Sequence, residues 1–332
     1  MAMNLLEQQT ANRRRTWLVM ALFVGFFLLL GYGFDRFFLG VEGVPIPLGS
    51  IVGLTVGSVS ALSGYYKGDR AVLLSTGAVP IEQSLSDAKD DAERFRLKQV
   101  ENVVAEMAIA AGLPQPRVYV IPDPDPNAFA TGRDPEHASV AMTSGLVDVL
   151  NREELQGVAA HELSHVRNFD IRLMTVIAAL VGAIVLLSDW AGRGMRYGGV
   201  SSSRRSRDRN GGGGLALVLL AVWIIAIVLA PLIGQSLAMM VSRRREYLAD
   251  ASGAELTRNP LALASALAKI EGAEAPTAAV KRGTANLCIA DPLGRSIGLR
   301  EGFMADLFAS HPPMDKRIAA LREMAYQSAS PR

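Results

Sequence analysis

Four long blocks of apolar residues constrain this chain more than any other feature. They cover residues 16–34, 43–66, 173–188 and 215–241, and none contains a charged side chain. The first, second and fourth are long enough to cross a bilayer as helices. The third has about 16 residues, roughly 24 Å as a helix, so it is predicted to be partly buried in protein or partly inserted. We therefore predict an integral membrane protein.

The basic residues that flank these blocks predict the orientation of the chain. Arg13, Arg14 and Arg15 precede the first block, and Lys67 and Arg70 follow the second. By the positive-inside rule, the N-terminus and residues 67–172 are cytoplasmic, and the loop at 35–42 lies outside. The loop between the third and fourth blocks carries six arginines and breaks this rule. Either the early spans dominate the orientation, or this second hairpin does not fully cross.

Charge and cysteine content indicate which partners and which cellular compartment fit this protein. The net charge of +2 gives no indication of a nucleic-acid partner. A single cysteine, Cys288, excludes an internal disulfide, which fits a reducing compartment.

The segments between the blocks predict helices and a small sheet. Residues 86–111 show helical spacing of apolar side chains, namely Phe95, Val100, Val103, Val104, Met107 and Ala111. Three short apolar runs at 117–121, 127–132 and 138–142 predict strands. A further helix is predicted to begin after Asn151, where Glu154 completes a capping pattern. The fold class expected is mainly α with a small β-sheet, an α+β zincin-like domain on a helical membrane part.

The motif at residues 161–165, His-Glu-Leu-Ser-His, carries the chemistry. On a helix, His161 and His165 lie on one face and can bind one metal ion together. Glu162 then lies close enough to take a proton from water activated by the metal. The alternative is a chance pattern on an exposed helix, which is expected in about 1% of chains of this length. The capped helix argues against that alternative, as does a chain with only four histidines.

A third ligand is predicted downstream, because catalytic zinc usually has three protein ligands. The segment 243–250 offers Glu246 as a ligand and Asp250, one turn later, as a hydrogen-bond partner of a ligand histidine. Asp170 is a weaker candidate for the same supporting role. An ordinary charged turn after a membrane helix is the alternative reading of 243–250.

Two residues near the C-terminus are candidates for stabilising a developing oxyanion. His311 or Arg317 could donate to it. Equally, Pro312 and Pro313 could open a final helix, with His311 merely preceding it. His137 is predicted to be a surface residue.

Taken in order, these motifs resemble the HtpX-type integral-membrane zinc metalloproteases, relatives of the CAAX-processing Ste24 protease and of the Oma family. The resemblance covers nearly the whole chain. It rests on the Asn-Ala-Phe-Ala-Thr-Gly segment at 127–132, the motif at 161–165, the segment 243–250, and His-Pro-Pro at 311–313 followed by Arg317.

The resemblance implies one catalytic Zn²⁺ held by His161, His165 and Glu246, with Glu162 as the general base. It implies that Asn127, Ala128, Phe129, Ala130, Thr131 and Gly132 form an edge strand that pairs with extended substrate. It also implies a role in membrane protein quality control, with membrane proteins or unfolded polypeptides as substrates and a bacterial inner or plasma membrane as the location.

These expectations divide the chain into four parts. Residues 1–66 form a membrane hairpin, and 67–172 begin the cytoplasmic catalytic domain. Residues 173–241 form a second hydrophobic hairpin with a disordered Ser/Arg/Gly loop at 189–214, and 242–332 complete the catalytic domain. Because the metal ligands flank this second hairpin, both its ends must lie on one side of the membrane, which we expect to be cytoplasmic.

Three rival functions are weaker. A CAAX-type protease would need a larger chamber than four spans provide. A non-proteolytic scaffold would not need Glu162, and a transporter would place polar groups within its spans.

Overall fold

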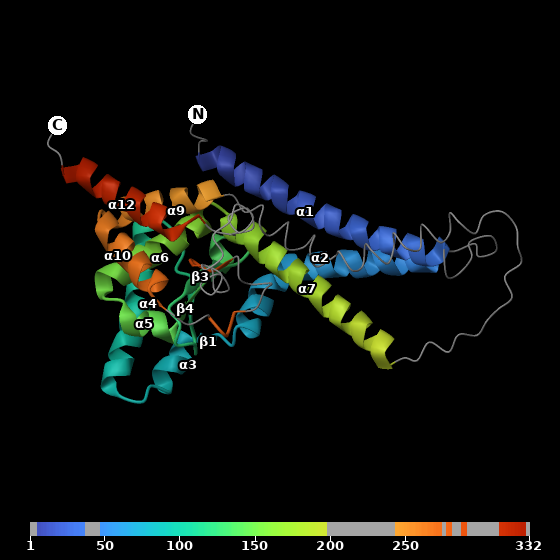
Figure 1. The fold of residues 1–332 in the computed structure, drawn as a ribbon, viewed down its shortest axis with the longest axis horizontal. Helices are drawn as coiled ribbons and strands as arrows, with labels where there is room; N and C mark the ends of the chain where they lie inside the picture. Colours follow the sequence, from blue (N-terminus) through green and yellow to red (C-terminus); the bar gives the residue numbers. More distant parts are fainter. Residues whose placement is uncertain are drawn as a thin grey trace, which may run out of the picture.

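The structure, a computed structural model, describes residues 5–36, 47–197, 243–273, 277–280, 287–290 and 312–329. His311, the fourth apolar block and residues 198–214 of the predicted disordered loop lie outside these ranges. Figure 1 shows a compact part at one end of the molecule, from which long helices extend to the other end.

Within the described residues, two of the extended helices are long and apolar enough to cross a membrane. They are α1 (Leu5–Phe34) and α2 (Leu48–Ser75), with candidate spans at Glu7–Phe34 and Leu48–Ser75. They pack closely, because glycines at 31, 49, 53 and 57 leave no side chain between the two backbones. Trp17, Leu18 and Leu22 of α1 are more than half exposed, as expected for a surface that faces lipid.

The third apolar block belongs to a longer helix than the sequence predicts. It lies within α7 (Asp170–Tyr197), which packs against α1 and α2 beside the sheet (Figure 1). Residues 189–197, predicted to be disordered, continue this helix, so that prediction is wrong for them. Extending an existing helix by one residue costs far less than starting one, so a polar segment can continue it.

The compact part has a four-stranded mixed sheet of order β1-β2-β4-β3. The strands are β1 (Val79–Pro80), β2 (Arg117–Ile121), β3 (Ala128–Thr131) and β4 (Ser139–Thr143). β2 and β4 are parallel, whereas β1 and β3 pair antiparallel with their neighbours. β3 is therefore at one edge of the sheet.

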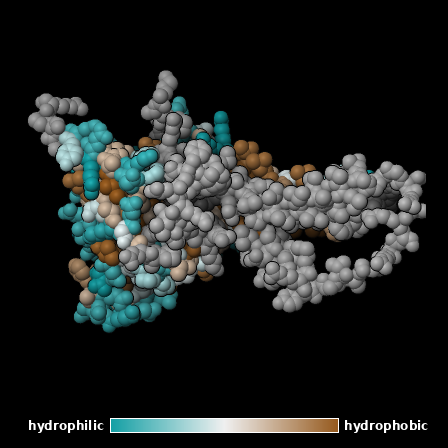
Figure 2. Space-filling view, viewed as in Figure 1, coloured by the Kyte–Doolittle hydropathy of each residue, from teal (hydrophilic) through white to brown (hydrophobic). Residues whose placement is uncertain are grey.

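In the compact part, helices pack around the sheet and against one another. They are α3 (Ile81–Ser86), α4 (Asp91–Ala111), the 3-10 turn η2 (Pro135–His137), α5 (Ser144–Val149), α6 (Arg152–Arg167), α9 (Arg243–Thr257), α10 (Pro260–Glu271) and α12 (Met314–Ala329). The mainly α fold with a small sheet is confirmed. Hydrophilic residues gather on this end of the molecule in Figure 2, as expected for a part in water.

The predicted helix at 86–111 is correct in type but begins late. Asp87 ends α3, and Asp90 caps α4 by accepting a hydrogen bond from the Glu93 N–H. Phe95, predicted to face the core, is 70% exposed, and Leu97 is buried instead. The apolar spacing therefore misplaced the buried face near the start of α4, where Leu97 rather than Phe95 joins the core.

α6 lies at the centre of the compact part, between α4, α9 and α10. Its N-terminus has the predicted capping box, in which Asn151 and Glu154 each accept a hydrogen bond from the other's backbone N–H. All residues from Leu155 to Val166 are buried except Gln156, which is half-buried. Gly253 of α9 packs directly on the backbone of His161, so the two helices approach closely there.

Candidate metal centre

Three predicted metal ligands converge inside the compact part. His161 and His165 come from α6 and Glu246 from α9, and one ligand atom from each lies within 4.8 Å of the others. The two imidazole Nε2 atoms are 3.3 Å apart. The Glu246 carboxylate lies 3.6 Å from Nε2 of His165 and 3.8 Å from Nε2 of His161. All three side chains are buried.

These distances fit a small tetrahedral metal ion. Two ligands at about 2.0–2.1 Å from zinc in tetrahedral geometry lie roughly 3.4 Å apart, close to the observed spacing. Two histidines and one glutamate are also a donor set found in catalytic zinc sites, where a fourth position stays open.

Each histidine is oriented by a carboxylate at its other ring nitrogen. Nδ1 of His161 lies 2.9 Å from Asp250 Oδ1, and Nδ1 of His165 lies 3.2 Å from Asp170 Oδ2. A proton on each Nδ1 leaves the Nε2 lone pair for a metal. The structure thus places both predicted supporting carboxylates, including the weaker candidate, next to a histidine.

The charges around the two histidines differ, and so do their pKa directions. Burial lowers the pKa of His161 despite the neighbouring Asp250. Burial opposes ionisation of His165 too, but the hydrogen bond to Asp170 and the charge of Glu246 raise its pKa to about 9. A metal that binds here must therefore displace a proton from His165.

Glu162 is buried beside this cluster without a hydrogen bond of normal geometry to either carboxylate oxygen. The backbone N–H of Ala130 lies near enough to favour its ionised form. Burial nevertheless raises the pKa of Glu162 to about 7, close to the value suited to a general base. Such an unsatisfied buried acid is rare in a purely structural site.

Arg317 of α12 is fully buried and contacts this cluster of side chains. Its Nε and Nη2 donate to the two oxygens of Asp250 at 2.8 and 2.7 Å, and Nη1 donates to Ile289 O at 2.8 Å. Nη1 also lies 3.6 Å from Glu246. Against burial, which alone would raise it, these contacts lower the pKa of Asp250 to about 2. Arg317 therefore contacts the supporting carboxylate rather than open space.

The predicted substrate strand lies on the sheet edge next to the cluster. Residues 127–132 contain β3, and Asn127 O accepts from the Thr143 N–H, on the β4 side. On the outer side, Ile289 N donates to Ala128 O at 2.8 Å, and Phe129 pairs with Cys288 in an antiparallel bridge. Part of this edge is therefore covered by residues 287–290.

Sequence reasoning missed several residues that surround the site. Arg245 donates to Asp170 at 3.3 Å, and Asn12 of α1 donates to the same carboxylate at 2.7 Å. A signal for Asn12 was present, since Gln8, Asn12 and Thr16 are polar residues spaced four apart at the start of the first apolar block. His137 is exposed, as predicted.

Comparisons with known proteins agree with this geometry. The model of peptidase family M48 matches residues 95–325. A protease HtpX homolog from Caldanaerobacter subterraneus subsp. tengcongensis is 41% identical over 96% of this chain and 98% of its own length. A protease HtpX homolog from Streptococcus gordonii is 39% identical over 96% of this chain and its full length.

Among solved structures, the chain is similar to Ste24p of S. mikatae, with 20% identity and a TM-score of 0.46. That match covers 95% of this chain and 67% of the other. The family match, which spans the motif helix, α9 and α12, and the near-full-length relatives together show that this protein belongs to peptidase family M48, among its HtpX-type membrane metalloproteases.

Proposed function

We propose that this protein is a zinc-dependent endopeptidase that cleaves membrane proteins or unfolded polypeptides on the cytoplasmic side of a bacterial inner or plasma membrane. The observation that carries the proposal is the convergence of two imidazole Nε2 atoms and the Glu246 carboxylate beside Glu162. His161, His165 and Glu246 would hold the metal ion. The activity would serve membrane protein quality control.

A zinc ion held by these residues supplies Lewis acidity toward a peptide carbonyl and lowers the pKa of a water molecule. Glu162 would accept a proton from the attacking water on a carboxylate oxygen and later deliver it to the departing amine. A pKa near neutrality suits a group that must both accept and release one proton.

The backbone of β3 supports a role in substrate binding. Alternation along a strand turns Ala128 and Ala130 to the outer edge, because Asn127 pairs inward with Thr143. The N–H and C=O of Ala130 then face the side where Glu162 lies. An extended peptide that pairs at Ala130, beyond the bond between Ala128 O and Ile289 N, would pass its scissile bond close to the base.

Charge distribution supports a cytoplasmic location of the site. Arg13, Arg14 and Arg15 lie at the end of α1 that packs against the compact part, where Arg13 covers the ring of Phe169. Since such basic clusters stay on the cytoplasmic side, the compact part would lie there too. Substrates would then be cut in loops or tails close to the bilayer.

The decisive experiment compares full-length, detergent-purified wild type with Glu162→Gln. We would measure bound zinc and the cleavage of casein as an unstructured substrate. Zinc in both proteins with cleavage in the wild type alone is the expected result. Equal cleavage by the variant would overturn the role of Glu162, and a wild type without zinc would overturn the metal assignment.

A further inference from the structure

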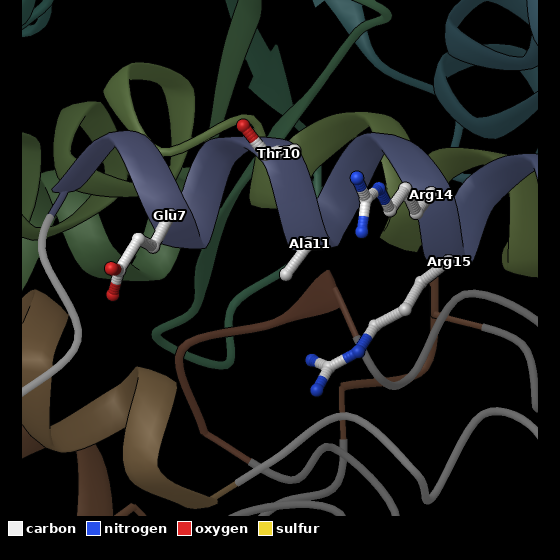
Figure 3. Close-up of a pocket in the computed structure, with 5 residues that line it drawn as sticks. All are labelled: Glu7, Thr10, Ala11, Arg14 and Arg15. Carbon is white, nitrogen blue, oxygen red and sulfur yellow. The ribbon is translucent and has the colours of Figure 1, made fainter.

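A stripe of buried polar side chains runs along one face of α1. Gln8, Asn12 and Thr16 are 6%, 1% and 0% exposed, although they belong to a helix that could span a membrane. Other side chains of the same turns, Glu7, Thr10, Ala11, Arg14 and Arg15, line a hollow that contains none of the predicted site residues (Figure 3). The buried face needs its own explanation, since burial of polar groups is costly unless they are hydrogen-bonded.

Asn12 bonds to the turn that joins α6 to α7. Its Nδ2 donates to Asn168 O at 3.0 Å and to Asp170 Oδ1 at 2.7 Å. The hydroxyl of Thr16 donates to Asn12 O at 2.9 Å. Both hydrogens of the amide are thus used on one turn, more than 150 residues away in the sequence.

This turn has a strained backbone that α1 helps to hold. Phe169 has a φ of 57°, in the left-handed region that residues other than glycine rarely adopt. Arg13 of α1 and Arg172 of α7 lie over its ring at 4.6 and 5.0 Å from the centroid. Contacts from two helices therefore stabilise the conformation that places Asp170.

Asp170 transmits this contact to the metal site. Its Oδ1 accepts hydrogen bonds from Nδ2 of Asn12 and, at 3.3 Å, from Nη1 of Arg245. Its Oδ2 lies 3.2 Å from Nδ1 of His165. Donors on one oxygen fix the plane of the carboxylate, and so fix the direction of the other oxygen toward the imidazole.

We propose that Asn12 of the first membrane helix is a positioning residue for His165, which it orients through Asp170. The proposal rests on the proposed function, because it takes His165 as a zinc ligand. It connects the membrane anchor to the metal site: displacing α1 from the α6–α7 turn would release Asp170 and weaken zinc binding.

The test uses full-length protein and measures zinc affinity by competition with a chelator. Supporting partners of metal-bound histidines typically change affinity by about 10- to 100-fold. Because Arg245 remains on Asp170, we expect Asn12→Ala to weaken zinc about tenfold and to alter the absorption spectrum of the cobalt-substituted protein. Gln9→Ala is the matched control, since the Gln9 amide donates to Arg167 O, in the same turn region, rather than to the Asp170 carboxylate.

A double-mutant comparison shows whether Asn12 acts through Asp170. Adding Asn12→Ala to Asp170→Asn should cause little further loss of affinity. If Asn12→Ala does not purify as a folded protein, Asn12→Asp keeps the size, removes the donor and should weaken zinc at least as much.

Three results would each overturn the proposal. Asn12→Ala could bind zinc with wild-type affinity, Gln9→Ala could lose as much zinc affinity as Asn12→Ala, or Asn12→Ala could cause its full loss of zinc affinity even when Asp170 is already replaced. A wild type that takes up no zinc would overturn the proposed function, and this inference with it.

Discussion

Arg317 shows how one buried side chain can hold together several groups around the proposed metal ligands. Its guanidinium forms a bidentate hydrogen-bonded pair with the Asp250 carboxylate, donates to Ile289 O, and lies near Glu246. A buried charge of this kind is stabilising only while its partners are in place. We therefore favour a supporting role for Arg317 over donation to an oxyanion.

Arg317→Lys separates these two roles. Lysine keeps the positive charge, but it cannot form the bidentate pair with Asp250 and donate to Ile289 O at the same time. We expect zinc affinity to fall about tenfold and the thermal midpoint of the detergent-solubilised protein to drop. Arg322→Lys, at an exposed position of the same helix, should change neither. Unchanged zinc affinity with a reduced kcat would instead identify Arg317 as an oxyanion donor.

At the scale of elements, the start of α6 is held by a carboxylate with three partners. Glu154 accepts hydrogen bonds from the Asn151 N–H, from Ser265 and from Lys269. Burial opposes ionisation, but these partners hold the pKa of Glu154 below its usual value. The stabilisation is therefore complete above the ordinary pKa and is lost as the pH falls through the folded value.

Glu154→Gln should thus lower stability in a pH-dependent way. At pH 7 we expect a cost of about 1 kcal/mol, or roughly 2 to 4 °C in thermal midpoint. The gap to wild type should be smaller at about pH 4, just below the ordinary pKa of glutamate, because the unfolded chain takes up the proton first. Glu101→Gln, which removes a surface pair with Lys98, is the control. An equal gap at both pH values would contradict the predicted linkage.

Hydrogen bonds between α7 and the end of β3 give a second prediction at this scale. The Thr175 hydroxyl contacts the Thr131 hydroxyl at 2.8 Å and accepts from the Gly132 N–H at 3.0 Å. Thr175→Val keeps the shape and removes both bonds, each worth about 1 kcal/mol. We expect kcat/KM for peptide cleavage to fall roughly fivefold with zinc affinity unchanged.

Thr55→Val is the control for this prediction, because the Thr55 hydroxyl donates within its own helix, to Ile51 O. A loss of zinc affinity in Thr175→Val would mean that the edge strand is coupled to the metal site rather than to substrate binding.

Local patterns in the sequence were enough to predict most elements of this fold. A short apolar run predicted β2, and the pair Asn151 and Glu154 predicted the start of α6, since both signals lie within a few residues. The pairing of Asp250 with Arg317 could not be predicted, because 67 residues separate them and no local pattern records a contact at that distance. The same holds for Asn12 and Asp170.

At the scale of the whole molecule, the predicted metal ligands flank the apolar segments that follow α6. His165 lies in the helix before α7, and Glu246 lies just after the start of α9, yet their side chains are 3.6 Å apart. The chain that leaves His165 must therefore return to the same place at Glu246. If the third and fourth apolar blocks enter the membrane, they must enter and leave it on one side.

Reporter fusions in bacteria test which side this is. α12 packs against α9 and α10, so a protein fused after Arg332 reports the side of the metal cluster. We expect green fluorescent protein at this position to fluoresce and alkaline phosphatase to be inactive, because basic residues of α1 favour the cytoplasm. Fusion within residues 35–42, which the sequence predicts to lie outside, should give the opposite pattern and is the matched control. Active phosphatase at the C-terminus, with the loop fusion inactive, would invert the orientation and move cleavage to the outer face.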